Sequence, residues 1–149
     1  MKTAIIIGAS TGIGRATALA LSGKYNSISI TSFKHKEELL SLRDELMAKG
    51  CICYCETGDA GDMEFMEKFI QNTIDHLGSG IDLLINNAGI SYVGLINDMT
   101  AQDFDRTMKS NVYSVFNSCR LVVPHMIQHH KGHIINISSV WGNVGASCE

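Results

Sequence analysis

Three glycines with the spacing G-x-x-x-G-x-G are the residues of this 149-residue sequence best suited to binding an anion. Gly8, Gly12 and Gly14 follow the apolar run 3–7 and precede a helix-like stretch, 15–21. Glycine allows a chain reversal at Gly8, close approach of an anion at Gly12, and tight packing of helix on strand at Gly14. A helix beginning there presents unpaired N–H groups and a positive dipole end, which suit a pyrophosphate. The stretch predicts a dinucleotide site, with an ordinary glycine-rich turn as the alternative.

The end of the second expected strand bears on the choice between NAD(H) and NADP(H). A carboxylate about 20 residues beyond a glycine turn of this kind would hold the adenosine ribose 2′-OH. No Asp or Glu occurs before Glu37, and the strand ends with Ser32, Phe33 and Lys34. Hydroxyl and ammonium groups accept a 2′-phosphate, which a carboxylate would repel. NADP(H) is therefore favoured over NAD(H), although Lys34 and Lys36 could simply begin a solvated helix.

Polar residues also follow the third, fourth and fifth expected strands. Asp59 comes just after the third strand, where an isolated Asp would cap a turn or helix. The sequence Asn-Asn-Ala-Gly at 86–89 ends the fourth strand and could be a turn. Ser138 and Ser139 end the fifth strand, where a hydroxyl could hold a substrate carbonyl for hydride transfer. Asn111 interrupts a long helical pattern and could mark a kink or an exposed polar position.

The elements that must position these residues alternate between strand and helix from end to end. Strands are expected at 3–7, 27–32, 51–56, 82–86 and 134–138, and helices at 13–22, 37–49, 62–77 and 100–130, with Gly50 and Gly78 closing the second and third helices. This alternation predicts an α/β fold with a doubly wound parallel sheet of the Rossmann type, in the strand order 3-2-1-4-5. Residues 1–149 are expected to form one dinucleotide-binding domain. Its ligands would gather at the carboxyl ends of the strands.

Two helix faces are predicted from small and apolar residues. Ala16 and Ala20 are expected to lie on the sheet. Apolar residues at helical spacing over 112–126 predict one continuous buried stripe, and Asn111 and Pro124 mark positions where the helix could become irregular.

The composition disfavours several classes of partner. A net charge of −3 provides no electrostatic footprint for nucleic acid or an anionic membrane. The amino terminus lacks the long apolar region of a signal peptide, and no stretch approaches the length of a membrane span. The five cysteines are therefore expected to be reduced, which favours a cytoplasmic location.

Neither the cysteines nor the histidines predict a metal site. Cys51, Cys53 and Cys55 alternate along one expected strand and so share a face. They contain no C-x-x-C pair, and small buried hydrophobic residues are the favoured interpretation. His125 and His129 lie one helical turn apart, but no neighbouring Glu or Cys completes a metal-binding motif.

Taken together, the G-x-x-x-G-x-G turn, the Asn-Asn-Ala-Gly segment and the strand ending at Ser139 resemble the short-chain dehydrogenase/reductase family over the whole chain. The likeness is greatest to its 3-oxoacyl-[acyl-carrier-protein] reductase branch. It implies an NADP(H)-dependent oxidoreductase that transfers a hydride between nicotinamide and a carbonyl or acyl-thioester substrate, as in fatty acid biosynthesis. Such enzymes are homo-oligomers, so the resemblance implies that state too.

The resemblance also assigns roles to residues. Ser139, or Ser138 as second choice, would hold the carbonyl, and Asn111 would bend its helix and hold a water of a proton relay. Asp59 would hold the adenine amino group, and the amide of an Asn at 86–87 would steady the sheet. The full set of implied cofactor contacts is Gly8, Ser10, Thr11, Gly12, Ile13, Gly14, Ser32, Phe33, Lys34, Asp59, Ala60, Asn87, Ala88 and Gly89.

One motif of that family is absent. Its Tyr-x-x-x-Lys pair follows the serine, but residues 140–149 contain neither Tyr nor Lys. None of the four tyrosines has a Lys four residues later. The sequence is therefore expected to be the amino-terminal part of a reductase, without the last strands, and inactive by itself. The alternative is a dinucleotide-binding sensor or scaffold without catalysis.

Overall fold

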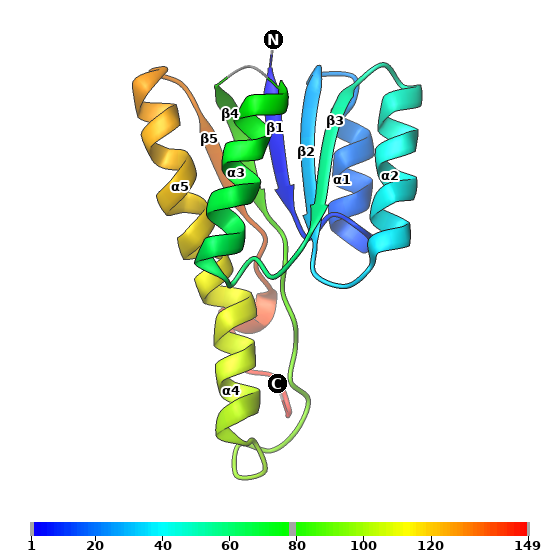
Figure 1. Cartoon of the computed structure of the whole chain (residues 1–149). Coiled ribbons are helices and arrows are strands. Elements are labelled where there is room, and N and C mark those ends of the chain that lie inside the picture. The colour runs from blue at the N-terminus through cyan, green and yellow to red at the C-terminus, as the bar shows by residue number, and fades with distance from the viewer. Residues whose placement is uncertain (1, 78–79, 149) are drawn as a thin grey trace.

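A five-stranded parallel sheet forms the centre of the structure, a computed structural model that describes residues 2–77 and 80–148 (Figure 1). The strands are β1 (Thr3–Ile7), β2 (Ser27–Ser32), β3 (Ile52–Thr57), β4 (Ile81–Asn86) and β5 (His133–Asn136). Their order is β3-β2-β1-β4-β5, and every neighbouring pair is parallel. The predicted doubly wound fold and strand order are confirmed. Gly78, expected to close the third helix, lies outside the described residues.

Helices cover both faces of the sheet, as Figure 1 shows. They are α1 (Gly12–Leu21), α2 (Lys36–Ala48), α3 (Met63–Leu77), α4 (Ala101–Met108), the π-helix η1 (Lys109–Tyr113), α5 (Ser114–Gln128) and the 3₁₀ turn η2 (Val140–Gly142). Helices α1 and α2 lie on one face, and α3 and α5 lie on the other. Helix α4 and the loop before it extend beyond the carboxyl ends of the strands, where the candidate site lies.

Two apolar clusters, one on each face, hold the layers together. Because successive strand side chains point to opposite faces, Ile6 of β1 packs under α1 and α2 while Ile5 packs under α3 and α5. Both isoleucines are completely buried, and each such side chain contributes about 1.5–3 kcal/mol relative to an exposed one. Leu42 on one face and Phe69 on the other are likewise fully buried. The central strands therefore fix the sheet that positions the glycine turn.

The prediction for the buried face of α1 is wrong. Ala16 and Ala20 are exposed, and the buried residues are Gly14 and Ala18. An added Cβ on Gly14 would lie 2.2 Å from the carbonyl oxygen of Gly8, so this residue is the point where helix and turn approach most closely. Ala18 lies one helical turn later on the same face, which sets the helix rotation.

The predicted stripe over 112–126 is also only partly correct. Val122 and Met126 are buried, but Val112 and Phe116 are 46% and 55% exposed. The helix widens to a π-helix around Asn111, one of the two positions marked as possible irregularities. Each π turn takes an extra residue, so α-helical spacing cannot be extended back across it. Toward its amino end the buried face of α5 is instead polar: Ser114, Asn117 and Ser118.

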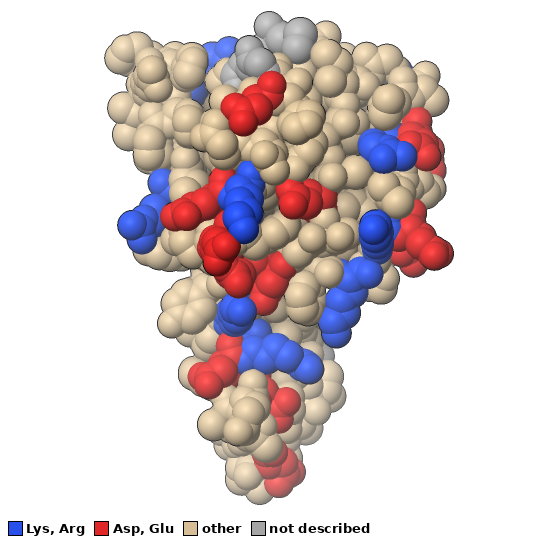
Figure 2. Space-filling model, viewed as in Figure 1, with Lys and Arg blue, Asp and Glu red and all other residues tan. Residues whose placement is uncertain are grey.

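One edge of the sheet is apolar and uncovered. The whole of β5 is exposed, with Ile134 37% and Ile135 46% accessible, and β4 is its one partner strand within residues 2–77 and 80–148. The strand also ends at Asn136, earlier than the predicted Ser138. Elsewhere on the surface shown in Figure 2, cationic and anionic side chains are interspersed. Among the described residues, no helix has the length and apolar character to cross a membrane.

Candidate functional site

The three glycines of the turn serve different geometric needs. Gly8 has a φ of 81°, and a Cβ there would lie 2.7 Å from the backbone of Ala88. Gly14 has no room for a Cβ because of the Gly8 carbonyl oxygen at 2.2 Å. Gly12 has a φ of 55°, but nothing lies within 4 Å of its Cβ position. Two glycines therefore allow close packing, while Gly12 leaves open space at the start of α1.

Hydrogen bonds to two neighbouring strands hold this turn in place. The backbone N–H groups of Gly8 and Ala9 both donate to the Thr31 carbonyl at 2.9 Å. From the other side, the Asn87 side chain donates to the Gly8 carbonyl at 2.7 Å, and its backbone N–H donates to Ile7 at 3.0 Å. The turn thus lies at the switch point of the sheet, between β2 and β4, where ligands bind in folds of this kind.

A cleft of about 400 Å³ opens at this switch point. It is lined by Gly8, Ser10, Thr11, Ser32, Phe33, Lys34, His35, Asn87, Ala88, Gly89, Ile90, Arg106 and Ser110. These residues come from β1, β2, β4, α4 and η1 or the loops that follow them. The volume and the mixed polar and apolar lining suit part of a dinucleotide.

The β2 side of the cleft carries hydroxyl and cationic groups. The Ser32 hydroxyl is buried and donates to the Ser10 hydroxyl at 2.8 Å. The Lys34 ammonium group lies over the ring of Phe33, 5.4 Å from its centroid. Among the described residues no carboxylate lines this cleft, although Glu37 and Glu38 border a separate hollow beyond Thr11.

Asp59 lines a smaller pocket next to the cleft, together with Ala60 and Ser32. Its Oδ1 accepts a hydrogen bond from the Gly61 N–H at 2.8 Å, so it does cap a turn. Its Oδ2 lies 3.0 Å from the ammonium nitrogen of Lys109, the first residue of η1. Hydrogen bonding to Asp59 raises the pKa of Lys109.

Asn111 uses both ends of its amide on one backbone unit. Its Oδ1 accepts from the Ile90 N–H and its Nδ2 donates to the Ile90 carbonyl, each at 2.8 Å. The side chain of this η1 residue therefore fixes the segment just after Gly89, which lines the cleft.

Ser139 is exposed and lies outside the residues that line the cleft. Its hydroxyl accepts from the Trp141 N–H at 3.2 Å and so begins the short helix η2. The segment before it is anchored to β4, since the Ile137 N–H donates to the Asn86 carbonyl at 2.8 Å. In this arrangement Ser139 is held by its own turn.

The structure brings most of the predicted cofactor residues together, but not all of them. The cleft includes Gly8, Ser10, Thr11, Ser32, Phe33, Lys34, Asn87, Ala88 and Gly89, and the adjoining pocket includes Asp59 and Ala60. Gly12 borders the separate hollow, Gly14 is buried, and Ile13 is 63% exposed.

Four residues that line the cleft were not predicted from the sequence: His35, Ile90, Arg106 and Ser110. His35 and Ile90 immediately follow predicted residues, so widening those segments would have included them. Arg106 and Ser110 lie far along the chain and reach the cleft only because α4 and η1 pass over it. No spacing in the sequence signals that approach.

A buried polar network ties the fourth and fifth strands to α5 beneath this site. The Ser118 hydroxyl donates to Asn86 Oδ1 at 2.7 Å, and Asn86 Nδ2 donates to Asn136 Oδ1 at 2.8 Å. Asn117 donates to the Ala60 carbonyl at 3.1 Å, which holds the loop that carries Asp59. The first Asn of the Asn-Asn-Ala-Gly segment thus joins strands, and the second holds the glycine turn.

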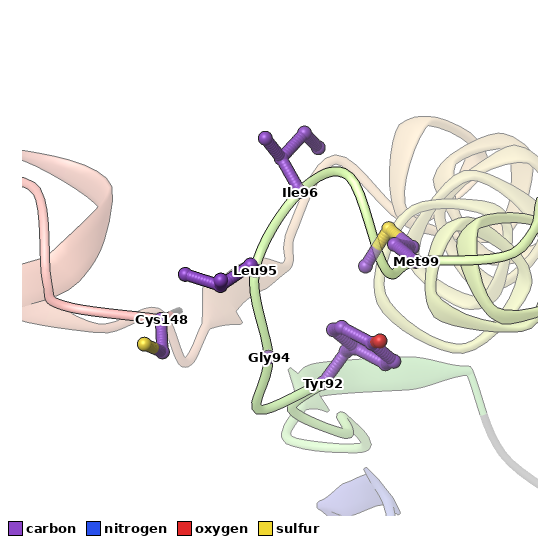
Figure 3. A pocket seen from close by; sticks show the side chains of 6 residues that line it. All are labelled: Tyr92, Gly94, Leu95, Ile96, Met99 and Cys148. Carbon is purple, nitrogen blue, oxygen red and sulfur yellow. The ribbon is translucent and has the colours of Figure 1, made fainter.

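A second cavity of about 260 Å³ is mainly apolar and is lined by residues outside the glycine turn (Figure 3). The loop between β4 and α4 provides most of its wall, including Tyr92, Leu95, Ile96 and Met99, and the tail provides Cys148. The Gly94 N–H donates to the Cys148 carbonyl at 2.9 Å, which joins the two walls.

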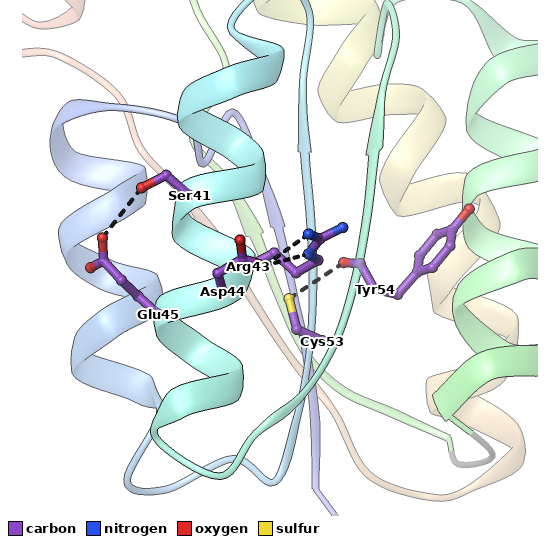
Figure 4. Close-up of polar contacts among 6 residues, drawn as sticks. All are labelled: Ser41, Arg43, Asp44, Glu45, Cys53 and Tyr54. Carbon is purple, nitrogen blue, oxygen red and sulfur yellow. Dashed lines mark hydrogen bonds and ion pairs between the residues drawn. The ribbon is translucent and has the colours of Figure 1, made fainter.

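Cys51, Cys53 and Cys55 pack on one face of the sheet, as predicted, but only Cys51 is buried and the other two are half-buried. Figure 4 shows Cys53 beside α2. Burial raises the pKa of Cys53 to about 12, and its Sγ lies 3.8 Å from the Tyr54 carbonyl. Arg43 pairs with Asp44 at 2.8 Å on the neighbouring helix. Among residues 2–77 and 80–148, no group of three or more His, Cys, Asp or Glu side chains could hold a metal ion.

A glycine turn between β1 and α1, at the switch point of a parallel sheet, is the arrangement of the Rossmann class of folds. Within that class, the model of the short chain dehydrogenase family matches residues 2–149. The chain belongs to the short-chain dehydrogenase family.

Individual relatives agree with this assignment. The 3-oxoacyl-[acyl-carrier-protein] reductase FabG of Staphylococcus aureus (strain Mu50 / ATCC 700699) is 34% identical over 144 residues, which cover 97% of this chain and 58% of that protein. The crystal structure of a 3-ketoacyl-ACP reductase from Sinorhizobium meliloti 1021 matches with a TM-score of 0.88 and 30% identity, over 94% of this chain and 55% of that one. The crystal structure of NAD⁺-bound xylitol dehydrogenase matches with a TM-score of 0.91 and 28% identity, over 99% of this chain and 56% of that one. The chain thus spans a little over half the length of these relatives.

Proposed function

We propose that this chain provides the NADP(H)-binding part of a carbonyl reductase of the short-chain dehydrogenase family, acting on 3-oxoacyl thioesters in the whole protein. The observation that carries the proposal is the cleft at the switch point. It carries hydroxyl and ammonium groups on the β2 side, and Ser10 and Thr11 join it to the hollow that Gly12 borders at the start of α1. Likeness to two 3-oxoacyl reductases supports the choice of substrate class.

The residues present fit a phosphorylated dinucleotide. A Cβ at Gly12 would project into open space at the amino end of α1, so glycine leaves the N–H groups there accessible to a pyrophosphate. Ser10, Ser32 and Lys34 are the groups to hold a 2′-phosphate, because all can donate hydrogen bonds to it. When bound, NADPH would supply the hydride for carbonyl reduction. The xylitol dehydrogenase is NAD⁺-bound, so the preference for NADP(H) rests on these side chains.

Two polar residues, Asn111 and Ser139, are the candidates for the end of the site where hydride transfer would take place. Asn111 fixes the Ile90 backbone and so shapes the wall beyond Gly89. Ser139 would donate its hydroxyl to the substrate carbonyl once that hydroxyl turns from the Trp141 N–H toward the cleft. No Tyr or Lys follows Ser139 in these 149 residues to act as a general acid. We therefore expect binding of the dinucleotide without turnover by these residues alone.

Calorimetric titration with NADP⁺, combined with an assay of NADPH oxidation by an acetoacetyl thioester, tests the proposal. We expect measurable binding and no turnover by the 149 residues. Fusing a carboxyl-terminal segment that contains Tyr-x-x-x-Lys should create activity, and Ser139→Ala should abolish it. Absence of dinucleotide binding, or rapid turnover by the 149 residues, would refute the proposal.

The second candidate is a dinucleotide-binding sensor or scaffold. It is favoured by the position of Ser139, which is held by its own turn outside the cleft-lining residues. In that case binding would persist, but no carboxyl-terminal extension would produce a reductase. The same titration and fusion experiment therefore separates the two candidates.

A further inference from the structure

The π-helix η1 contacts the wall of the cleft at two places. Asn111 binds the Ile90 backbone, beside the end of β4. Lys109, two residues earlier, pairs with Asp59, which follows β3. Ser110, between them, lines both the cleft and the smaller pocket. One five-residue segment thus reaches two ends of the site.

Three residues form a compact unit at the β3 end. Asp59 Oδ1 accepts the Gly61 N–H, and Asp59 Oδ2 pairs with the Lys109 ammonium. Gly61 also makes room for the incoming helix, because a Cβ there would lie 2.5 Å from Lys109 Cγ and 2.6 Å from its carbonyl oxygen. The absence of a side chain at Gly61 therefore lets Lys109 reach the carboxylate.

The ion pair between Asp59 and Lys109 is only partly exposed to solvent. The side chain of Asp59 is 30% exposed and that of Lys109 is 46% exposed. A partly exposed ion pair adds little to stability, so its main effect here is on orientation. With each carboxylate oxygen held by a different donor, rotation about the last bond of Asp59 is restricted.

The pocket next to this carboxylate suits the edge of a flat base. Its other walls are apolar or weakly polar and include Ile7, Ala60 and Ala88. An ionised carboxylate only accepts hydrogen bonds, so it selects a base edge that donates one. The 6-amino group of adenine does so, whereas the 6-oxo group of hypoxanthine would face the carboxylate with a second acceptor.

We propose that Lys109 is a positioning residue that orients Asp59 to select adenine over a 6-oxo purine in the dinucleotide. The inference rests on the proposed function, since it requires that the cleft binds NADP(H). Lys109 itself acts through Asp59 and Gly61 and touches no part of the ligand. Its hydrogen bond with Asp59 also raises the pKa of Lys109, so the ammonium form is the one present at neutral pH.

The test compares NADP⁺ with nicotinamide hypoxanthine dinucleotide phosphate by calorimetric titration. We expect the unmodified chain to bind the adenine form about tenfold more tightly, the ratio that corresponds to one hydrogen bond to a charged group. Lys109→Met should reduce this ratio to about twofold or less, and Lys109→Arg should retain most of it. Gly61→Ala should also reduce the ratio, because it displaces Lys109 without removing its charge.

Lys68→Met is the matched control. Lys68 pairs with Glu64 at 2.8 Å on α3. This pair is more exposed than that of Lys109 and Asp59, and neither of its residues lines the cleft. This variant should leave the ratio of the affinities for the adenine and hypoxanthine dinucleotides unchanged. Thermal unfolding should show that every variant compared is folded. A ratio for Lys109→Met equal to that of the unmodified chain overturns the inference, while NADP⁺ binding remains. If the unmodified chain binds neither dinucleotide, the proposed function fails and this inference fails with it.

Discussion

The side-chain amide of Asn87 donates a hydrogen bond of 2.7 Å to the carbonyl oxygen of Gly8, a residue 79 positions earlier in the chain. This bond joins the end of β4 to the glycine turn after β1. Gly8 has no side chain that could pack against its neighbours. The position of the turn therefore depends on its backbone hydrogen bonds to Asn87 and Thr31. The amino end of α1, proposed above to bind a pyrophosphate, is thus held by two neighbouring strands.

Replacing Asn87 by Leu should therefore destabilise the protein as well as weaken binding. The Gly8 carbonyl would lose its side-chain donor, and an unpaired polar group in a protein interior costs about 1–3 kcal/mol. We expect the free energy of unfolding in urea to fall by about that amount. Asn97→Leu, at an exposed loop position, should change it by less than about 0.5 kcal/mol. Equal effects of the two changes would show that the Asn87 bond is unimportant.

The glycines of the turn should differ in their tolerance of alanine. Gly14→Ala forces a Cβ to within 2.2 Å of the Gly8 carbonyl oxygen, and such overpacking costs about 1–3 kcal/mol or more. Gly12→Ala meets open space and carries only the cost of a left-handed backbone, about 1–2 kcal/mol. We expect Gly12→Ala to fold yet bind NADP⁺ at least tenfold more weakly. Unaltered binding by a folded Gly12→Ala would contradict the role proposed for the turn.

The dinucleotide preference should reverse when a carboxylate is placed at the end of β2. Ser32→Asp should repel a 2′-phosphate and offer acceptors to a 2′-OH, so NADP⁺ should bind more weakly and NAD⁺ more tightly. Titrations of both ligands measure the change, with Ser147→Asp in the exposed tail as the control for added charge. If the unmodified chain already binds NAD⁺ as well as NADP⁺, the proposed preference is wrong.

The half-buried thiol of Cys53 should be nearly unreactive at neutral pH. Its pKa is raised to about 12 by burial, and only the thiolate is alkylated. Mass spectrometry after iodoacetamide treatment at pH 8 should show labelling of the exposed Cys148 long before Cys53. The unfolded thiol ionises near pH 8.5, so Cys53 should also reduce stability as the pH rises from about 9 toward 12. Rapid labelling of Cys53 in the folded protein would contradict this.

The exposed edge of β5 should make the 149-residue chain associate. An uncovered strand presents unpaired N–H and C=O groups, here beside the apolar side chains of Ile134 and Ile135. Light scattering at micromolar concentration should detect dimers or larger species, and Ile135→Lys should shift the population toward monomers. Met47→Lys is the control, at an exposed position of α2, the helix that packs against β2 and β3 at the opposite end of the sheet. A monodisperse monomer of the unmodified chain would refute the expectation.

The sequence alone predicted the fold because each of its signals acts locally. Apolar runs such as 3–7 are fully buried strands, and their alternation with helices leaves few topologies for a parallel sheet. The need for glycine at Gly14 likewise reflects a contact within one turn, with the Gly8 carbonyl oxygen, whereas the close contact of Gly8 is with the distant Ala88. Asn111 was identified as an irregular point because Asn is a weak helix former.

Only the tertiary structure decided what meets across the cleft. The π-helix shifts the helical register, so it exposes Val112 and Phe116 and brings Lys109 to Asp59, and neither result follows from α-helical spacing. Arg106 joins the lining because α4 extends past the strand ends, and Ser139 turns onto its own backbone instead of the cleft. These contacts join residues distant in sequence, and their geometry depends on how whole elements pack. Local residue patterns specify the elements, whereas side-chain contacts between them are fixed only when the elements are assembled.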